Sequence, residues 1–171
     1  MKRRPSKALF VPLFLILLLL IGSPAAAARV VKLFYIESSI LSSRVQYSIL
    51  LSDNFTIHSA SPVFSYRVYR SGRTRKLNWT ERKFAYNFRQ TVSRDSTSVR
   101  IVLSKYPHKP ITVKFSGKHI RPYITIKGKK CRLEKIYIKA TGNEAWPSVK
   151  YARVTGFDTF SGEKLTERID R

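Results

Sequence analysis

The sequence contains little of the side-chain chemistry on which most enzymes rely. Cys131 is the single cysteine, and the three histidines, His58, His108 and His119, lie far apart. One cysteine cannot form an intramolecular disulfide, and isolated histidines do not give the Cys/His spacing of a metal site. The sequence also has no Gly-rich phosphate-binding loop and no G-x-S-x-G element. We therefore expect no metal, no cofactor and no catalytic residue of a recognised type.

Acidic residues are scarce as well. Ten Asp and Glu stand against 33 Lys and Arg, which gives a net charge of +23. The acidic residues are mostly isolated, so no paired-carboxylate site is visible. A charge of this sign attracts polyanions such as anionic lipid headgroups, acidic glycans and nucleic acid, but it does not select among them.

The first 28 residues have the pattern of a cleavable signal peptide. Four basic residues precede an unbroken apolar run over 8–21, and Pro24 and a stretch of alanines follow it. The apolar run is shorter than the roughly 20 residues that span a bilayer, and no later stretch is long or apolar enough to do so. We expect cleavage after Ala28, with cleavage after Ala27 as the second choice, and export to the periplasm, the cell surface or the medium. Residues 29–171 would then form a single β-rich domain, with 29 Lys and Arg against ten Asp and Glu and a net charge of +19.

Beyond Arg29, apolar and polar residues mostly alternate, as they do in half-buried strands. Val, Ile, Tyr and Phe are frequent, and glycines fall between the apolar segments. Gly156 is different because it lies inside a strand pattern, which indicates a β-bulge. The predicted strands cover residues 30–37, 44–51, 63–70, 88–93, 98–105, 111–115, 122–127, 131–140, 149–157 and 164–169.

One segment departs from the strand pattern. Asn78 and Glu81 have the spacing of a capping box, and residues 80–88 contain neither Gly nor Pro. This pattern predicts one short amphipathic α-helix. The expected fold is therefore all-β, a mainly antiparallel sandwich or partly open barrel, with one short α-helix covering an end.

The helix segment also carries the best candidates for a binding surface. Arg82 and Tyr86 share a helix face and Trp79 adjoins it, so an aromatic ring, a guanidinium and a phenol could hold a carboxylate, phosphate or sugar. A structural interpretation competes with this one. In it, Trp79, Phe84 and Phe88 close the end of the sandwich, and Glu81 and Arg82 form ion pairs with strand residues such as Lys135 and Glu134. The candidate binding residues are Trp79, Glu81, Arg82, Tyr86, Tyr66 and Lys135.

Basic and aromatic residues are also interleaved along several strands, as in oligonucleotide-binding barrels. Alternation on a half-buried sheet produces the same mixture without any nucleic-acid function. No nucleic-acid motif is present, and export argues against such a partner.

Several segments resemble one known family. Leu77-Asn-Trp-Thr-Glu-Arg-Lys-Phe-Ala-Tyr-Asn-Phe88 is similar to the "LNW-x-ERK-x-AYGF" stretch of the bacterial domain-of-unknown-function 4833 family, with Asn87 in place of the usual Gly. Four further segments resemble the later strands of this family: Tyr106–Val113, Leu133–Ile138, Val149–Gly156 and Gly162–Arg168. The resemblance implies an exported compact domain, and it implies no activity.

Three hypotheses for function follow. The first is a non-enzymatic binding or structural module of the cell envelope that contacts an anionic component, such as a lipid headgroup or an acidic glycan, or another protein. The second is an envelope enzyme, such as a hydrolase, with an unrecognised site. A cleft holding two carboxylates, or a His beside Ser or Cys, would favour the second. The third is a nucleic-acid binder.

Overall fold

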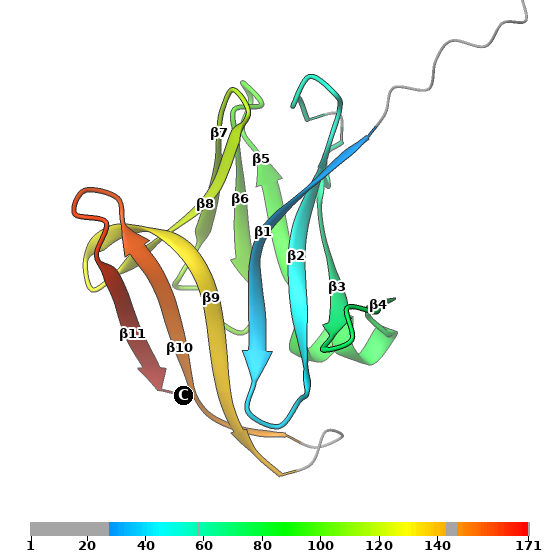
Figure 1. Cartoon of the computed structure of the whole chain (residues 1–171), viewed down its shortest axis with the longest axis vertical. Helices are drawn as coiled ribbons and strands as arrows, with labels where there is room; N and C mark the ends of the chain where they lie inside the picture. Colours follow the sequence, from blue (N-terminus) through cyan, green and yellow to red (C-terminus); the bar gives the residue numbers. More distant parts are fainter. Residues whose placement is uncertain (1–27, 58, 143–146, 171) are drawn as a thin grey trace, which may run out of the picture.

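The computed structural model describes residues 28–57, 59–142 and 147–170, which form one curled eleven-stranded sheet (Figure 1). The signal peptide expected at 1–28 lies outside these ranges except for its last residue. Within the described ranges, no helix is both long and apolar enough to cross a membrane.

The all-β prediction is confirmed, and each of the ten predicted strands is present. One strand, β4, was not predicted, because its three residues are all exposed and carry no apolar pattern. The strands are β1 (Arg29–Ser38), β2 (Ser43–Leu51), β3 (Val63–Tyr69), β4 (Thr74–Lys76), β5 (Phe88–Val92), β6 (Ser98–Leu103), β7 (Ile111–Ser116), β8 (His119–Ile126), β9 (Lys129–Thr141), β10 (Ser148–Asp158) and β11 (Lys164–Asp170).

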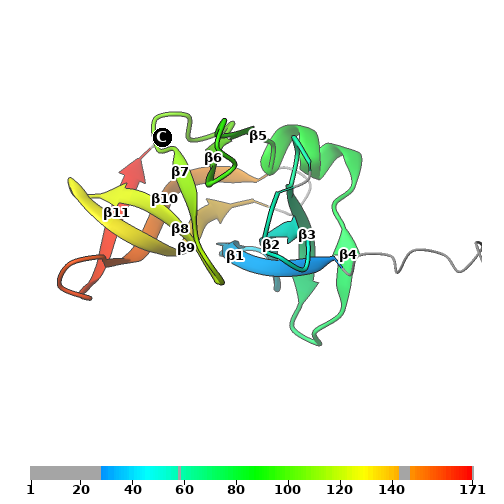
Figure 2. The same cartoon turned by 90° about the horizontal axis from the view of Figure 1, so that it is seen from above.

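The sheet forks at β9. One edge of β9 pairs with β10 along most of its length, and β11 follows β10. The opposite edge pairs first with β8, through residues 129–132, and then with β1, through residues 135–138. Two arms therefore leave the same edge, β1-β2-β3-β4 and β8-β7-β6-β5, and they lie in separate layers in Figure 2. The β1–β9 pair is parallel, whereas the other pairs are antiparallel.

The core lies between the two arms. Alternate residues of most strands point into it, as the period of two predicts. Tyr47 and Phe34 stack with their ring centroids 4.6 Å apart, and Phe88 meets Tyr47 edge-on at 5.4 Å. The buried side chains of the second arm include Val99, Ile101, Ile111, Val113 and Ile126.

A side-chain amide joins the far ends of the arms. Gln90 on β5 donates from Nε2 to the carbonyl of Val63 on β3 (2.9 Å), and its Oε1 accepts the N–H of Val63 (2.8 Å). The short β4 pairs only with residues 66–68, so this edge of β3 has no strand partner at Val63. Gln90 therefore takes the place of a strand partner there.

We expect the substitution Gln90→Leu to lower the free energy of unfolding by about 2 kcal/mol, because it leaves the N–H and C=O of buried Val63 without partners. Urea denaturation measures the loss. Arg89→Ala, at the exposed neighbouring position, should change stability by less than about 0.5 kcal/mol. Equal stability of Gln90→Leu and the native protein would show that the amide does not hold the arms together.

The helical segment is shorter than the 80–88 predicted, and it is not a regular α-helix. It covers residues 79–85 and contains a π-helical turn, Glu81–Ala85, in which Tyr86 N–H donates to the Glu81 carbonyl (2.9 Å). The capping box is present: Asn78 Oδ1 accepts the N–H of Glu81 (2.8 Å), and Glu81 Oε2 accepts the N–H of Asn78 (2.7 Å). The helix ends early because Tyr86 turns into the core and Phe88 pairs with Leu103 in the sheet.

Candidate functional site

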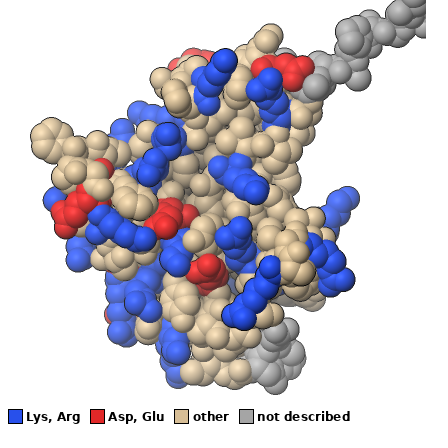
Figure 3. Space-filling view, in the orientation of Figure 1, with Lys and Arg blue, Asp and Glu red and all other residues tan. Residues whose placement is uncertain are grey.

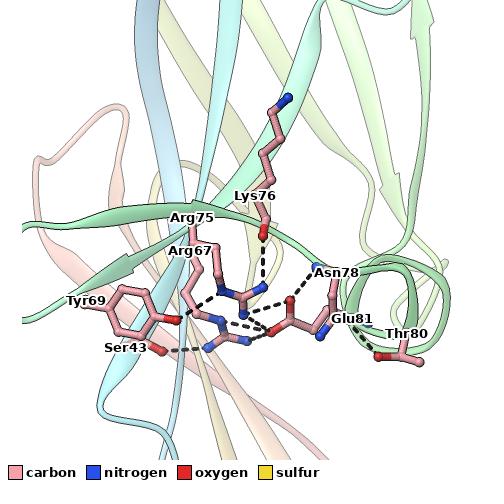
Figure 4. Close-up of polar contacts among 8 residues, drawn as sticks. All are labelled: Ser43, Arg67, Tyr69, Arg75, Lys76, Asn78, Thr80 and Glu81. Carbon is pink, nitrogen blue, oxygen red and sulfur yellow. Dashed lines mark hydrogen bonds and ion pairs between the residues drawn. The ribbon is translucent and has the colours of Figure 1, made fainter.

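The best-connected polar cluster is centred on Glu81, the acidic residue of the capping box (Figure 4). Its Oε1 accepts hydrogen bonds from Arg67 Nε (3.0 Å) and from Arg75 Nη2 (2.9 Å). Arg67 is buried, and its Nη1 donates to Ser43 Oγ at 2.6 Å. Arg75 Nε donates to the hydroxyl of Tyr69 at 3.1 Å. Glu81 thus joins the helical turn to β3 and β4.

The electrostatics of this cluster favour the ion pairs. Burial by itself would raise the pKa of Glu81, but the hydrogen bonds from the Asn78 N–H, Arg75 and Arg67 outweigh it, so the pKa lies below its ordinary value. The hydrogen bond from Arg75 lowers the pKa of Tyr69. Burial raises the pKa of Tyr86, whose ring lies 5.9 Å from the Arg67 guanidinium. Glu81 is therefore ionised and already bonded to two arginines, so its role is to hold the structure together.

Glu81 forms ion pairs with strand residues, as the structural interpretation of the helix predicted, but its partners are Arg67 and Arg75. Arg82 is exposed and takes no part in the cluster. Lys135 instead pairs with Glu37 at 3.0 Å, which raises the pKa of Lys135, and Glu134 lies beside Lys164 at 2.8 Å. Long-range pairing decides these contacts, because β9 meets β1 and β10 and not the helical turn.

The expectation that three aromatic residues close the end of the sandwich is also wrong for two of them. Phe88 packs on Tyr47, but Trp79 and Phe84 are exposed and contact each other. The residue that enters the core from this segment is Tyr86, whose carbonyl accepts a hydrogen bond from Tyr47 Oη (3.1 Å). The π-helical turn gives the segment a different register from the α-helix on which the expectation rested.

The six candidate binding residues are not brought into one site. Tyr66 lies next to Arg67 on β3, so its side chain points to the opposite face of the sheet from the Glu81 cluster. That outer face carries a lateral row of paired residues, in the order Lys76, Tyr66, Gln46, Tyr35 and Lys135. Tyr66 and Lys135 therefore share the outer face, away from Glu81 and Tyr86.

A hollow opens on the outer face at the fork, where β1 and β8 part from β9. Its volume is about 330 Å³, within the lower range of small-molecule sites. Basic side chains line it from four strands: Lys32, Arg44, Arg121 and Arg132. Aromatic rings lie beside them, with Arg44 over Tyr35 (4.9 Å) and Arg132 over Phe157 (5.2 Å). Figure 3 shows Lys and Arg scattered across this view of the molecule among other residues, with fewer Asp and Glu.

The basic groups of the hollow have spare hydrogen-bonding capacity. Among the described residues, none of the four forms an ion pair with a carboxylate. A guanidinium stacked on a ring keeps its N–H groups at the edge, where they can donate to an anion. The outer-face hollow is therefore suited to a negatively charged ligand.

Among the described residues that line this hollow, Glu134 is the one that is acidic. Its Oε2 is buried and lies 2.8 Å from Lys164 Nζ, so its charge is balanced by that ammonium group. A second hollow shares Arg132 and Phe157 with the first and contains one carboxylate, Asp158.

Sequence reasoning did not select the residues of the hollow. Arg132 stands out only as one of several basic residues near a turn, and Lys32, Arg44 and Arg121 do not stand out at all. The basic and aromatic residues come together through pairings between strands distant in sequence. The decisive pairing is that of β1 with β9, and no local pattern in the sequence reveals it.

The fold and the hollow define an all-β domain built on one forked sheet with a basic outer surface. The family model of a domain of unknown function (DUF4833) matches residues 34–168. The chain belongs to this family, which confirms the resemblance seen in the sequence. No curated protein and no solved structure matches the chain.

Proposed function

We propose that this protein is an exported, non-enzymatic binding module of the cell envelope, and that the outer-face hollow takes an anionic ligand, such as a segment of an acidic glycan. The observation that carries the proposal is the set of four basic side chains around the hollow, none of which forms an ion pair with a carboxylate of the described residues. The signal-peptide pattern of the sequence supports export.

The hydrolase hypothesis receives less support. A glycosidase needs two carboxylates that flank the scissile bond. Among the described residues, the outer-face hollow and the second hollow beside it are each lined by one carboxylate, Glu134 in the first and Asp158 in the second. Asp158 accepts a hydrogen bond from Phe160 N–H (2.8 Å), an interaction that lowers its pKa and favours the ionised form.

The test is a binding titration with polygalacturonate, a polymer of acidic sugars, on the protein in its exported form. We expect the double substitution Arg44→Ala, Arg132→Ala to weaken binding at least tenfold, because each charge-assisted hydrogen bond contributes about 1.5–3 kcal/mol and about 1.4 kcal/mol corresponds to tenfold. Dextran, which is neutral, should not bind.

The matched control is the pair Arg89→Ala, Arg100→Ala. It removes the same charge from exposed positions on β5 and β6. If it weakens binding as much as the substitutions in the hollow, the interaction depends on overall charge and the hollow is not the site. A DNA sequence that stays bound at a salt concentration where polygalacturonate is released would favour the nucleic-acid hypothesis instead.

A further inference from the structure

The helical segment presents two large aromatic side chains to solvent. The side chain of Trp79 is 59% exposed and that of Phe84 is 56% exposed. Their rings meet edge-on with centroids 5.8 Å apart, and Lys83 Nζ lies 4.7 Å from the centre of the Trp79 ring. These two residues and Lys83 form a small amphipathic patch, which we call the Trp79 patch.

The surroundings of the Trp79 patch are strongly basic. Residues 67–89 contain eight Lys and Arg and one acidic residue, Glu81. Glu81 is occupied by Arg67 and Arg75, so it offers no net negative charge to a partner. Arg82 and Lys83 are exposed beside the aromatic rings. A surface that approaches this patch therefore meets apolar rings within a field of positive charge.

An anionic bilayer has the complementary properties. Its headgroups are negatively charged, and Trp is enriched at the level where headgroups meet acyl chains, because the ring is apolar with one polar N–H. Basic side chains next to exposed aromatic residues are the composition of elements that lie on membrane surfaces. The helical segment that carries the patch also lies at the periphery of the molecule (Figures 1 and 2).

The geometry points to the Trp79 patch as a peripheral membrane contact, in which Trp79 and Phe84 enter the headgroup region of an anionic phospholipid bilayer while Arg82 and Lys83 lie against the phosphates. This contact does not depend on the outer-face hollow, which involves different strands. It would hold the exported protein at a membrane surface with the hollow free to bind.

Partitioning onto phosphatidylcholine vesicles with and without phosphatidylglycerol tests the proposal. The double substitution Trp79→Ala, Phe84→Ala should reduce binding to phosphatidylglycerol vesicles at least about tenfold. Both side chains are exposed, so the variant should unfold at nearly the native temperature, and polygalacturonate binding should be unchanged. The exchange Arg82→Glu, Lys83→Glu should reduce binding to the anionic vesicles alone.

Phe160 provides the matched control. It is fully exposed on the β10–β11 hairpin, on the opposite side of the molecule from the helical segment (Figures 1 and 2). Phe160→Ala should leave vesicle binding within about twofold of native. The proposal is wrong if Trp79→Ala, Phe84→Ala partitions like the native protein, or if Phe160→Ala causes an equal loss. In a Trp146→Phe background, where Trp79 is the remaining tryptophan, a Trp79 emission that does not shift to shorter wavelength on anionic vesicles would also contradict it.

Discussion

Glu81→Ala is expected to lower the free energy of unfolding by about 3–5 kcal/mol. The substitution leaves the Arg67 guanidinium, whose side chain is only 7% exposed, without its carboxylate partner. Removing one member of a buried ion pair is costly because the remaining charge stays in a poorly solvated position. Alanine also removes the acceptor of the Asn78 N–H, so the start of the helical segment loses its cap. Urea denaturation of both proteins measures the difference.

Arg82→Ala is the control for this prediction. Arg82 is adjacent in sequence and exposed, so its removal should change stability by less than about 0.5 kcal/mol. The same comparison separates the two interpretations of the helix residues, since Glu81 is structural and Arg82 is free to meet a ligand or a surface. A loss at Arg82 as large as the loss at Glu81 would contradict this assignment.

The contribution of Glu81 should also depend on pH. Its pKa is lower in the folded protein than the value of about 4.5 expected when unfolded. Its stabilising effect is therefore fully present above about pH 4.5 and is lost as the pH falls through the folded-state pKa. The stability difference between the native protein and Glu81→Ala should shrink in that acidic window.

The strands were predictable because their signal is local. An alternation such as that of Ile111, Val113 and Phe115 reports which side of one strand is buried, and it needs no knowledge of the partner strand. The capping box was predictable for the same reason, since Asn78 and Glu81 satisfy each other within one turn. The helix length was not predictable, because the helical pattern in the sequence continues to Phe88. In the structure, Phe88 instead pairs with Leu103 in the sheet.

The outer-face hollow could not be derived from local patterns. It depends on the fork, where β1 pairs in parallel with a strand about one hundred residues further along the chain. It depends also on irregularities in register, one in β1 between Lys32 and Phe34 and one in β9, where Glu134 is the extra residue between the partners of Gly156 and Thr155. Arg132 and Glu134 line the same hollow because they are two residues apart on β9, and the bulge at Glu134 changes which face the residues after it occupy.

Gly156 connects the bulge to the proposed site, and Gly156→Ala should be strongly destabilising. A Cβ atom at this position would lie 2.6 Å from the backbone carbonyl oxygen of Arg132 and 3.1 Å from Ile126 Cδ1. The close approach of β10 to β9 is therefore possible only without a side chain. The register between the two strands also shifts next to Gly156, which confirms the β-bulge that the sequence pattern indicated. Relieving the clash must move backbone in a packed sheet, and we expect a loss of about 3 kcal/mol in the free energy of unfolding.

The same substitution should weaken polygalacturonate binding, because the Arg132 backbone that must shift carries one of the basic side chains of the hollow. Gly117→Ala is the comparison. Gly117 has a φ of +55° in the β7–β8 turn, and an added Cβ would have no atom within 4 Å, so its cost of about 1–2 kcal/mol comes from the left-handed backbone alone. This control should lose stability and keep its affinity for the polymer. If Gly156→Ala, measured under conditions where it is fully folded, also binds with native affinity, then the register at the bulge does not set the geometry of the binding site.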